Sequence, residues 1–451
     1  MGKTYDKYIQ SNSRFDRKIP SSWQEKKIGR IFDFVSDKNH PEEELLSVFL
    51  NKGVVSYSST SQMQVHKPSE DLSNYQLVKV GDFVLNNQQA WRGSVGVSRY
   101  SGIISPAYYI LRAREDFNSS YLNYAVRDKA VVDQFVLASK GVGSIQRQIY
   151  VPYLKEVYLQ IPPKPEQDQI AQYLDWKTTE IDKFIQQKRK QIKTLEEYKL
   201  TQIDELVTKG IDKSVAMKDS DVEWLGDIPS HWLVHTIKQH FKVRKRIAGK
   251  EGYDILSITQ QGLKVKDISS NEGQMAQNYS GYQFVYPGDF AMNHMDLITG
   301  YVDLSNKFGV TSPDYRVFTL EDTERCYPQY YLRVFQMGYK RRIFYKFGKG
   351  AAAQGRWRLP KRAFYNYPIL VPPIEEQIQI EEECERLEKY VDEMSEALRK
   401  EMDLLQELRT RIISDAVTGQ IDVRDVVIPE YDGNTDWDDT DIEETLDNDE
   451  K

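Results

Sequence analysis

Apolar residues recur at two positions of a seven-residue repeat near the C-terminal end of the sequence. Between residues 374 and 419, nine of ten such positions are apolar and most intervening positions are charged. The ten positions are Ile380, Cys384, Leu387, Val391, Met394, Leu398, Glu401, Leu405, Leu408 and Ile412. This pattern predicts a long helix whose apolar seam forms a coiled coil with a second helix.

A second long helix is predicted over residues 165–210, with a less regular seam. Lys188 and Gln202 interrupt this seam. The other seam positions are apolar or aromatic, namely Ile170, Leu174, Ile181, Phe184, Leu195 and Tyr198. Each long segment follows a Pro-Pro pair, lacks proline and glycine beyond its first turn, and ends at a glycine, as helix C-termini often do.

Five short motifs of the first half of the sequence return in the second half. They begin at residues 19, 81, 105, 161 and 207 and return at residues 228, 288, 312, 371 and 417. The offset is 207–210 residues in every case, which indicates a duplicated chain with pseudo-twofold symmetry. The duplication favours helix pairing within the chain over a seam between two copies, and twofold symmetry then makes the helices antiparallel.

Each repeat opens with a globular part that mixes short strands and helices. Apolar segments on both sides of Gly81-Asp82 predict a hairpin, and residues 121–135 and 329–345 predict helices. The expected fold class is therefore α+β. The expected divisions are two globular domains, two spacer helices and a tail, at residues 1–164, 211–373, 165–210, 374–419 and 420–451.

The net charge of −7 comes from the C-terminal end. Residues 430–451 contain eleven acidic residues and one basic residue, so the rest of the chain carries a formal charge of +3. The tail has few apolar residues, and we expect it to be disordered. No apolar stretch approaches the roughly 20 residues of a membrane helix, so we expect a cytoplasmic protein with no membrane partner. Cys326 and Cys384 are far apart in the sequence, which argues against a disulfide framework or a zinc cluster.

Three segments resemble a known family. The opening of the second repeat, Val222-Glu-Trp-Leu-Gly-Asp-Ile-Pro229 followed by Trp232, is similar to the start of a target-recognition domain in type I restriction-modification specificity (S, HsdS) subunits. The Pro-Pro then Glu-Gln entry to each long helix and the Val417–Asp422 ending resemble that family's helical spacers. The first repeat has Ile19-Pro20 and Trp23 but lacks the Glu-Trp-Leu-Gly portion.

The resemblance implies a non-catalytic subunit that binds double-stranded DNA. Each globular domain would read one half of a split target, and the helices would act as the ruler between them. Two methyltransferase (M) subunits would dock on the helices, and restriction would also need motor-nuclease (R) subunits. S-adenosylmethionine, ATP and Mg²⁺ are expected on those partner chains, with no cofactor on this one.

Basic residues in the second repeat are candidates for DNA contact. The stretch 340–362 contains no acid and interleaves aromatic residues with basic ones. Its candidates are Lys340, Arg341, Arg342, Lys346, Lys349, Arg356 and Arg358. Basic groups neutralise phosphates, and arginine can pair with guanine edges. The alternative is a solvated basic helix face.

Amides and arginines give candidates in the first repeat, where asparagine and glutamine can pair with adenine. They are Asn86, Gln88, Gln89, Arg92 and Arg99, with Asn293 as the second-repeat counterpart of Asn86. Turn polarity is an equally good explanation of the amides.

Glycine-containing loops before each Pro-Pro pair add a further set, because glycine lets a backbone approach a DNA groove. This set consists of Lys140, Gln146, Arg147 and Gln148 in one repeat and Lys349, Gln354 and Arg356 in the other.

Signs of catalysis and metal binding are weak. His231, His235 and His240 lie close in sequence, but no nearby cysteine or carboxylate completes a metal set, so packing or surface roles are favoured. We find no methyltransferase Asn-Pro-Pro motif, Walker motif or nuclease cluster, and we assign no catalytic residue. The alternatives are a specificity subunit of a methylation-only system and a coiled-coil scaffold that binds only protein.

Overall fold

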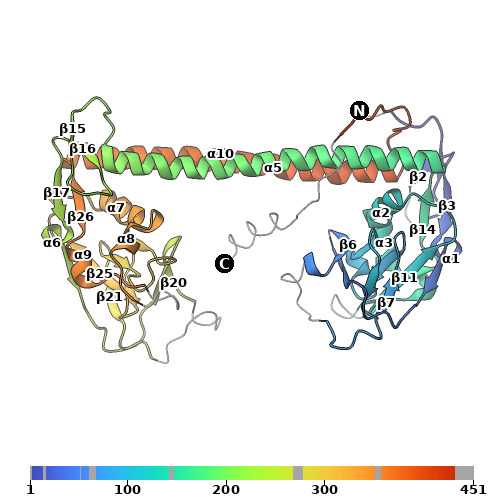
Figure 1. Cartoon of the computed structure of the whole chain (residues 1–451), viewed down its shortest axis with the longest axis horizontal. Helices are drawn as coiled ribbons and strands as arrows, with labels where there is room; N and C mark the ends of the chain where they lie inside the picture. Colours follow the sequence, from blue (N-terminus) through green and yellow to red (C-terminus); the bar gives the residue numbers. More distant parts are fainter. Residues whose placement is uncertain are drawn as a thin grey trace. The chain divides into compact units, whose positions relative to one another are not determined.

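The computed structural model describes residues 3–13, 17–50, 52–59, 68–141, 147–267, 278–350 and 357–431. The chain forms two compact units, the first from residues 1–188 and 399–451 and the second from residues 189–398. Each unit contains one globular part and one half of each of two long helices, α5 (Lys164–Lys209) and α10 (Ile374–Val417) (Figure 1). The mixture of helices and sheets confirms the predicted α+β class.

An antiparallel sheet lies at the centre of the first unit. Its strands run in the order β4 (Phe32–Val35), β11 (Tyr108–Ala113), β8 (Phe83–Asn86) and β9 (Val95–Val97). Two helices contribute apolar side chains to the same core as the sheet, α2 (Ser119–Arg127) and α3 (Lys129–Leu137). Each helix begins at an N-cap side chain, Asn118 or Asp128, that accepts a backbone hydrogen bond from the first turn.

Short elements complete the first unit. Antiparallel strand pairs are β1 (Tyr8–Gln10) with β2 (Lys18–Pro20), β3 (Gln24–Lys27) with β14 (Tyr158–Ile161), β5 (Leu46–Phe49) with β6 (Gly53–Ser56), β7 (Gln76–Val78) with β10 (Gly102–Ile104), and β12 (Ser139–Lys140) with β13 (Gln148–Ile149). The short helices are α1 (Ile28–Ile31), η2 (Ala90–Arg92) and α4 (Val151–Leu154).

The second unit repeats the sheet of the first. Its strands run in the equivalent order, β18 (Phe241–Arg244), β25 (Arg316–Leu320), β22 (Phe290–Met292) and β23 (Val302–Leu304). The strand pairs are β15 (Met217–Asp219) with β16 (Asp227–Pro229), β17 (Leu233–Thr236) with β26 (Pro368–Val371), β19 (Leu256–Thr259) with β20 (Gly262–Val265), and β21 (Gln283–Val285) with β24 (Gly309–Thr311). Its helices are α6 (Ile237–His240), α7 (Pro328–Lys340), α8 (Ile343–Lys346) and α9 (Lys361–Tyr365).

The repeated motifs of the sequence attach the helices to the globular parts. In the first unit Trp23 Nε1 donates to Glu166 in the first turn of α5 at 2.8 Å, and in the second unit Trp232 Nε1 donates to Glu376 in the first turn of α10 at 3.0 Å. Gly210, which follows α5 with φ +75°, has Trp232 beside it, so a Cβ there would lie 3.1 Å from the indole ring. The tryptophan of each repeat therefore contacts the start of one long helix and the glycine after the other.

Within each unit, the two helix segments run antiparallel. In the first unit Asp182 pairs with Arg409 at 3.2 Å and Lys188 with Glu401 at 2.6 Å. In the second unit Lys199 pairs with Asp392 at 3.3 Å. Residue numbers rise along one helix while they fall along the other, as the duplication predicts. Lys188, a misfit in the predicted seam, is thus half-buried beside an acid.

Burial follows one row of the predicted coiled-coil seam along its whole length and the other row only as far as Leu387. Cys384, Val391 and Leu398 are buried, and Leu405 and Ile412 are partly buried. Ile380 is buried and Leu387 is partly buried, but beyond residue 391 the other row shifts by one residue. Met394 and Leu408 are exposed, and the residues one position later, Ser395 and Arg409, lie inward. The same shift exposes Phe184 and Tyr198 of α5 and turns Ile185 and Lys199 inward.

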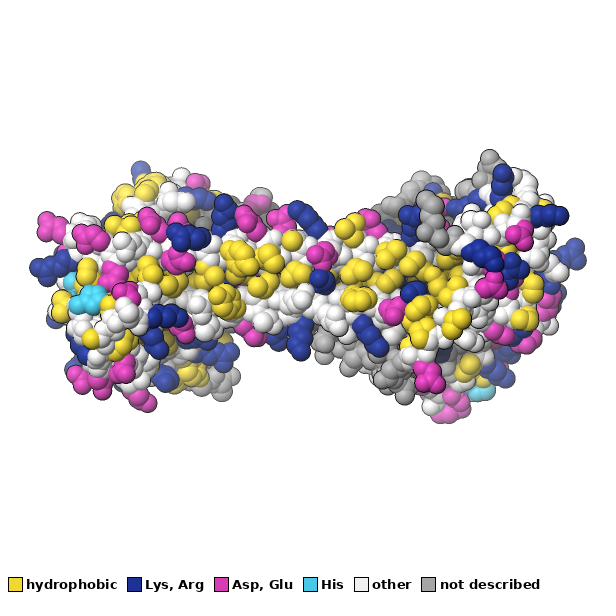
Figure 2. All heavy atoms as spheres, turned by 90° about the horizontal axis from the view of Figure 1, so that it is seen from above, with side chains coloured by type: hydrophobic (Ala, Val, Ile, Leu, Met, Phe, Trp, Pro, Cys, Tyr) yellow, Lys and Arg dark blue, Asp and Glu magenta, His cyan; other side chains and the backbone are white. Residues whose placement is uncertain are grey.

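Helix geometry accounts for the shift. A straight helix has 3.6 residues per turn and drifts about 20° per heptad against a strict seven-residue seam. The sequence is apolar on a stripe wider than the contact, so the pattern alone does not select which edge is buried. The rejected edge becomes an exposed apolar row on the helix pair, visible in Figure 2 as side chains gathered over α5 and α10. No helix among the described residues is long and apolar enough to cross a membrane.

Candidate nucleic-acid interface

Two candidate segments of the first unit lie together at the end of β8. The backbone N–H of Ile149 donates to the carbonyl of Asn87 at 3.0 Å, so the loop before α4 lies against the turn after β8. The guanidinium groups of Arg92 and Arg147 lie 4.8 and 5.4 Å from the centre of the Trp91 ring. Trp91 Nε1 donates to the carbonyl of Gln88 at 2.9 Å. Two arginines thus share one aromatic ring, although the sequence separates them widely.

The second unit has the same pairing of loops. The backbone N–H of Leu359 donates to the carbonyl of His294 at 2.9 Å, and that of Leu297 donates to the carbonyl of Trp357 at 3.3 Å. Lys349 and Arg358 exchange two backbone hydrogen bonds of 2.8 and 3.1 Å. We call these two loop pairs, residues 86–92 with 147–149 and residues 293–299 with 357–359, the paired loops. The candidates Gln146, Gln354 and Arg356 lie outside the described residues.

The side chains of Asn86 and Asn293 stabilise turns in the paired loops. The side-chain oxygen of Asn86 accepts the backbone N–H groups of Gln88 and Gln89 at 2.9 and 3.2 Å. That of Asn293 accepts the N–H of Met295 at 3.2 Å. These oxygens hold the loop conformation, which is the alternative that the sequence left open for the amides.

Other candidates of the first unit present polar or charged groups at the surface. Gln88, Arg92, Arg99, Lys140 and Gln148 are exposed, and Gln89 is half-buried. The ammonium of Lys140 lies 3.6 Å from the centre of the Tyr150 ring, and both residues are exposed.

Residues 83–114 contain no acidic residue, yet two arginines of this stretch are held by acids from elsewhere in the fold. Arg112 makes two hydrogen bonds to Asp82, at 2.8 and 2.7 Å, and Arg114 pairs with Asp33. An acid-free stretch of sequence is therefore not an acid-free surface.

The basic stretch of the second unit divides into anchored and exposed residues. Arg341 pairs with Asp204 of α5 and donates to Thr201 at 3.3 Å, so it ties the end of α7 to the helix pair. The other described basic candidates of this stretch are exposed, namely Lys340, Arg342, Lys346, Lys349 and Arg358. None of them forms an ion pair with another described residue.

The aromatic residues between these bases do not form an exposed stacking surface. Phe344 is fully buried in the core of the second unit. Trp357 stacks on Tyr345 with ring centres 5.2 Å apart, and its Nε1 donates to the Tyr345 carbonyl at 2.7 Å. The interleaving that suggested nucleic-acid stacking in the sequence is packing of a short helix against its own loop.

The structure reveals a buried arginine and a half-buried histidine at the second pair of loops. Arg316 donates to the carbonyl of Leu359 at 2.8 Å and lies 4.6 Å from the centre of the Phe364 ring. Burial lowers the pKa of Arg316 to about 10 and that of His294 to about 3. Among the described residues, neither Nη1 of Arg316 nor Nδ1 of His294 has a hydrogen-bond partner. The sequence held no signal for this pair, because Arg316 occupies a strand position.

Comparison with known proteins finds similarity to one family. Residues 20–194 match the family model described as type I restriction modification DNA specificity domain. The chain is 22% identical over 435 residues to the type I restriction enzyme MjaVIII specificity subunit of Methanocaldococcus jannaschii, covering 91% of this chain and 95% of that protein. It is 24% identical over 445 residues to the putative MjaX specificity subunit of the same organism, covering 90% and 95%.

A solved structure shares the fold. A chain from a study of complex assembly and conformational transition of the type I restriction-modification system matches with a TM-score of 0.60 and 14% identity, over 90% of this chain and all of that one. The sequence and structure comparisons together confirm the resemblance to type I specificity subunits that the motifs indicated.

Proposed function

We propose that this chain, which carries a type I restriction-modification DNA specificity domain, is the non-catalytic subunit that selects the DNA target for its complex. Each globular part would read one half of a bipartite target in double-stranded DNA. The observation that carries the proposal is the presence of paired loops in both units, each with guanidinium groups held at the end of the central sheet. Guanidinium and amide groups are the side chains best suited to base edges.

The charges at the paired loops support a DNA ligand. The guanidinium groups of Arg92 and Arg147 both lie over the Trp91 ring, and neither forms an ion pair among the described residues, which favours an incoming anion. In the second unit, Arg358 and Lys349 are exposed, and the buried Arg316 and the half-buried His294 each have a nitrogen atom without a hydrogen-bond partner among the described residues. Phosphates would neutralise the exposed cations, while hydrogen-bonding base edges would reach deeper groups.

Partner subunits would dock on the exposed apolar rows of the helix pair. In the first unit the row contains Phe184, Leu404 and Leu408. In the second unit it contains Tyr198, Tyr390 and Met394. Phe184 corresponds to Met394, and Tyr198 to Leu408, by the 210-residue offset of the repeat. One methyltransferase subunit for each row gives two in the complex, and these partners, with any restriction subunits, would supply S-adenosylmethionine, ATP and Mg²⁺ chemistry.

Methylome sequencing tests the proposal directly. A host that carries this chain and its methyltransferase should acquire methylation at one split sequence, and a host with the methyltransferase alone should not. A gel-shift with mixed genomic DNA separates this function from a coiled-coil scaffold, which would not bind DNA. Methylation without restriction of unmodified DNA would identify a methylation-only system. Absence of any sequence-specific methylation and of DNA binding would contradict the proposal.

A further inference from the structure

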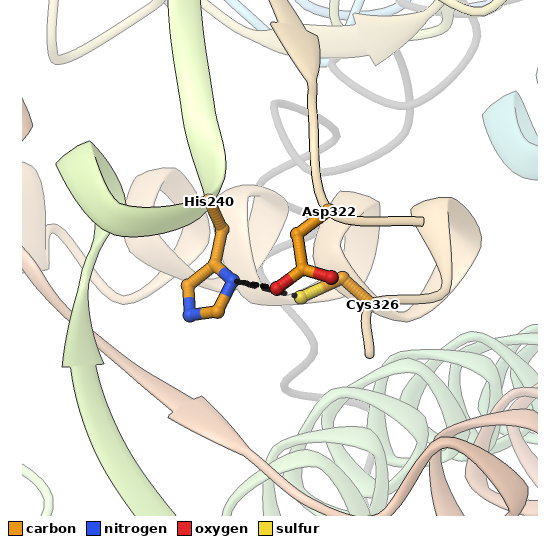
Figure 3. Close-up of side chains that lie close together, drawn as sticks. All are labelled: His240, Asp322 and Cys326. Carbon is orange, nitrogen blue, oxygen red and sulfur yellow. Dashed lines mark hydrogen bonds and ion pairs between the residues drawn. The ribbon is translucent and has the colours of Figure 1, made fainter. Parts of the chain in front are cut away.

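Three chemically different side chains converge in the second unit at the start of the central sheet. His240, the last residue of α6, directs Nδ1 toward Asp322 and Cys326 from the loop between β25 and α7 (Figure 3). The Nδ1 to Asp322 Oδ2 distance is 3.1 Å, and the Nδ1 to Cys326 Sγ distance is 3.4 Å. All three potential ligand atoms lie within 4.8 Å of one another.

Strand pairing brings these residues together across more than 80 positions of sequence. Phe241, which follows His240, pairs with Leu320 in the β18–β25 ladder, and the N–H of Glu321 donates to the carbonyl of His240 at 2.8 Å. The loop then reaches α7, whose N-cap Tyr327 donates its N–H to Gln377 at 2.8 Å. The prediction that no cysteine or carboxylate lies near His231, His235 and His240 is therefore wrong for His240.

The second nitrogen of His240 is already engaged. Its Nε2 lies 2.7 Å from Nδ1 of His235, and the two rings stack with centres 4.9 Å apart. Both Asp322 and Cys326 thus approach the same ring nitrogen. In a catalytic triad, the cysteine and the carboxylate contact opposite nitrogens of the histidine ring. Here both contact the same nitrogen, so this arrangement does not suit nucleophilic catalysis.

Hydrogen bonds within the cluster do not join all three side chains. Nδ1 of His240 can donate to the carboxylate or accept from the thiol, but not both, and Cys326 Sγ has a second possible partner in the hydroxyl of Tyr331 at 3.4 Å. A metal ion between the three atoms would use all of them, because tetrahedral zinc with bonds of about 2.0–2.3 Å places its ligand atoms about 3.3–3.6 Å apart. The two distances from Nδ1, 3.1 and 3.4 Å, are close to that value. A thiol, an imidazole and a carboxylate are all zinc ligands.

The cluster lies just below the surface of the second unit. His240 and Cys326 are buried, whereas Asp322 is half-buried, so solvent reaches the cluster at its carboxylate. His240 also lines a surface cleft of about 310 Å³.

The first unit shows that the fold does not require this cluster. Ile31 occupies the place of His240, since each residue directly precedes the first strand of its central sheet. Phe117 occupies the place of Cys326, since each precedes the N-cap of the first helix after that sheet. Glu115 takes the place of Asp322 and pairs with Lys26, the counterpart of His235, at 2.6 Å. Apolar packing and a surface ion pair therefore complete the same position in the other repeat.

We propose that His240, Asp322 and Cys326 bind one divalent transition-metal ion, with zinc the best match to this donor set. Water would complete the coordination, and His235 would hold the His240 ring by accepting from Nε2–H. The ion would fasten the end of α6 to the loop that leads into α7. Because Ile31 and Phe117 replace two of the ligands in the first unit, the ion would bind only to the second.

Cobalt and zinc titrations of the full chain, freed of metal with a chelator, test this site. One equivalent of Co²⁺ should bind and produce thiolate-to-cobalt charge-transfer absorption, and Zn²⁺ should displace it. Cys326→Ser should abolish the thiolate absorption, whereas Cys384→Ser should keep it, since Cys384 is buried in the α10 seam of the same unit. His235→Ala should weaken zinc binding about 10–100-fold, as expected for the partner of a metal-bound histidine.

A variant at the most accessible ligand keeps the test independent of core folding. Asp322→Asn retains the shape of a half-buried side chain, and it should bind zinc more weakly while its circular dichroism spectrum stays unchanged. Absence of stoichiometric binding to the unmodified chain would overturn the proposal. Equal binding by the Cys326→Ser and Asp322→Asn variants would overturn it as well. None of these readouts depends on DNA binding or on methyltransferase partners.

Discussion

The two units attach their long helices with nearly identical contacts but fill the spaces around those contacts with different chemistry. Trp23 with Glu166 and Trp232 with Glu376 form the same hydrogen bond at the start of a helix. Gln167 and Gln377 each accept a backbone N–H from the N-cap residue of the neighbouring helix, at 3.0 and 2.8 Å. These contacts need a particular residue type at a fixed place, so both repeats retain them.

The contacts between the long helices and the helices of the globular parts differ between the units. Where α2 meets α5, Tyr124 donates to Asp175 at 2.8 Å. Where α7 meets α10, Arg333 instead pairs with Glu381 at 2.9 Å and also with Glu388. Loop residues differ more, with Trp91 and Arg147 in one unit and His294 and Arg358 in the other. The two repeats therefore share the attachment of the long helices, whereas the helix packing and the loop residues differ between them.

The largest effect is expected where the units agree. Trp23→Ala and Trp232→Ala should each lower the free energy of unfolding by about 3–5 kcal/mol, since a large buried ring is lost. The carboxylates of Glu166 and Glu376 would also lose their indole donors. Urea denaturation of the full chain measures both losses. A large loss in one unit with a negligible loss in the other would contradict the equivalence of the two attachments.

A smaller and unequal effect is expected where the helix contacts differ. Arg333→Met should cost about 3 kcal/mol, because it leaves Glu381 buried without its cation. Tyr124→Phe should cost about 1.5 kcal/mol, because it removes a single hydrogen bond to a charged group. Urea denaturation of the two variants at the same pH gives the difference, and equal losses would show that the ionic contact adds nothing over the phenolic one.

The Arg333 variant also carries a pH dependence with a definite sign. Burial already raises the pKa of Glu381 above its ordinary value, and removal of the guanidinium raises it further. A carboxyl group whose pKa is higher in the folded state favours folding at low pH, and this contribution is lost as pH rises through the folded pKa. The variant should therefore recover part of its loss between about pH 7 and pH 5, where the carboxyl group takes up a proton. A loss that grows on acidification would contradict this cause.

Variants in the paired loops test whether each unit reads its own half of the DNA target. Arg147→Ala should alter only the half-sequence read by the first unit, and Arg358→Ala only that read by the second. Each lost base contact should cost about 1–3 kcal/mol. Methylome sequencing with a methyltransferase partner reports which half changes. If both variants weaken binding equally over all sequences, these arginines contact phosphate and the readers lie elsewhere.

The smallest effect is expected at the turn asparagines. Asn86 accepts two backbone hydrogen bonds and Asn293 accepts one. Asn86→Ala should cost about 1 kcal/mol and Asn293→Ala about half as much. Thermal denaturation measures both losses, and gel-shift affinities for the target DNA serve as the control. A change in the methylated sequence without a loss of stability would make these asparagines readers instead of turn residues.

The sequence by itself determined the duplication and the two long helices. Helices, caps and repeated motifs depend on residues close in the chain, so periodicity and offset were sufficient to predict α5, α10 and their antiparallel pairing. The resemblance to type I specificity subunits rested on the same local motifs and was confirmed by comparison. Candidate segments at residues 86–92 and 147–148 were also found from local composition.

Only the tertiary structure decided which of these groups act together. It selected the buried row of the helix pair, which placed Ser395 inside and Met394 outside, because a stripe wider than the contact can pack on either edge. It joined Arg147 to Trp91, anchored Arg341 on Asp204, and placed Cys326 beside His240. Each of these contacts depends on strand pairing or helix packing between distant segments. A one-residue change of register reverses the direction of a side chain in a strand, and no pattern of neighbouring residues records that choice.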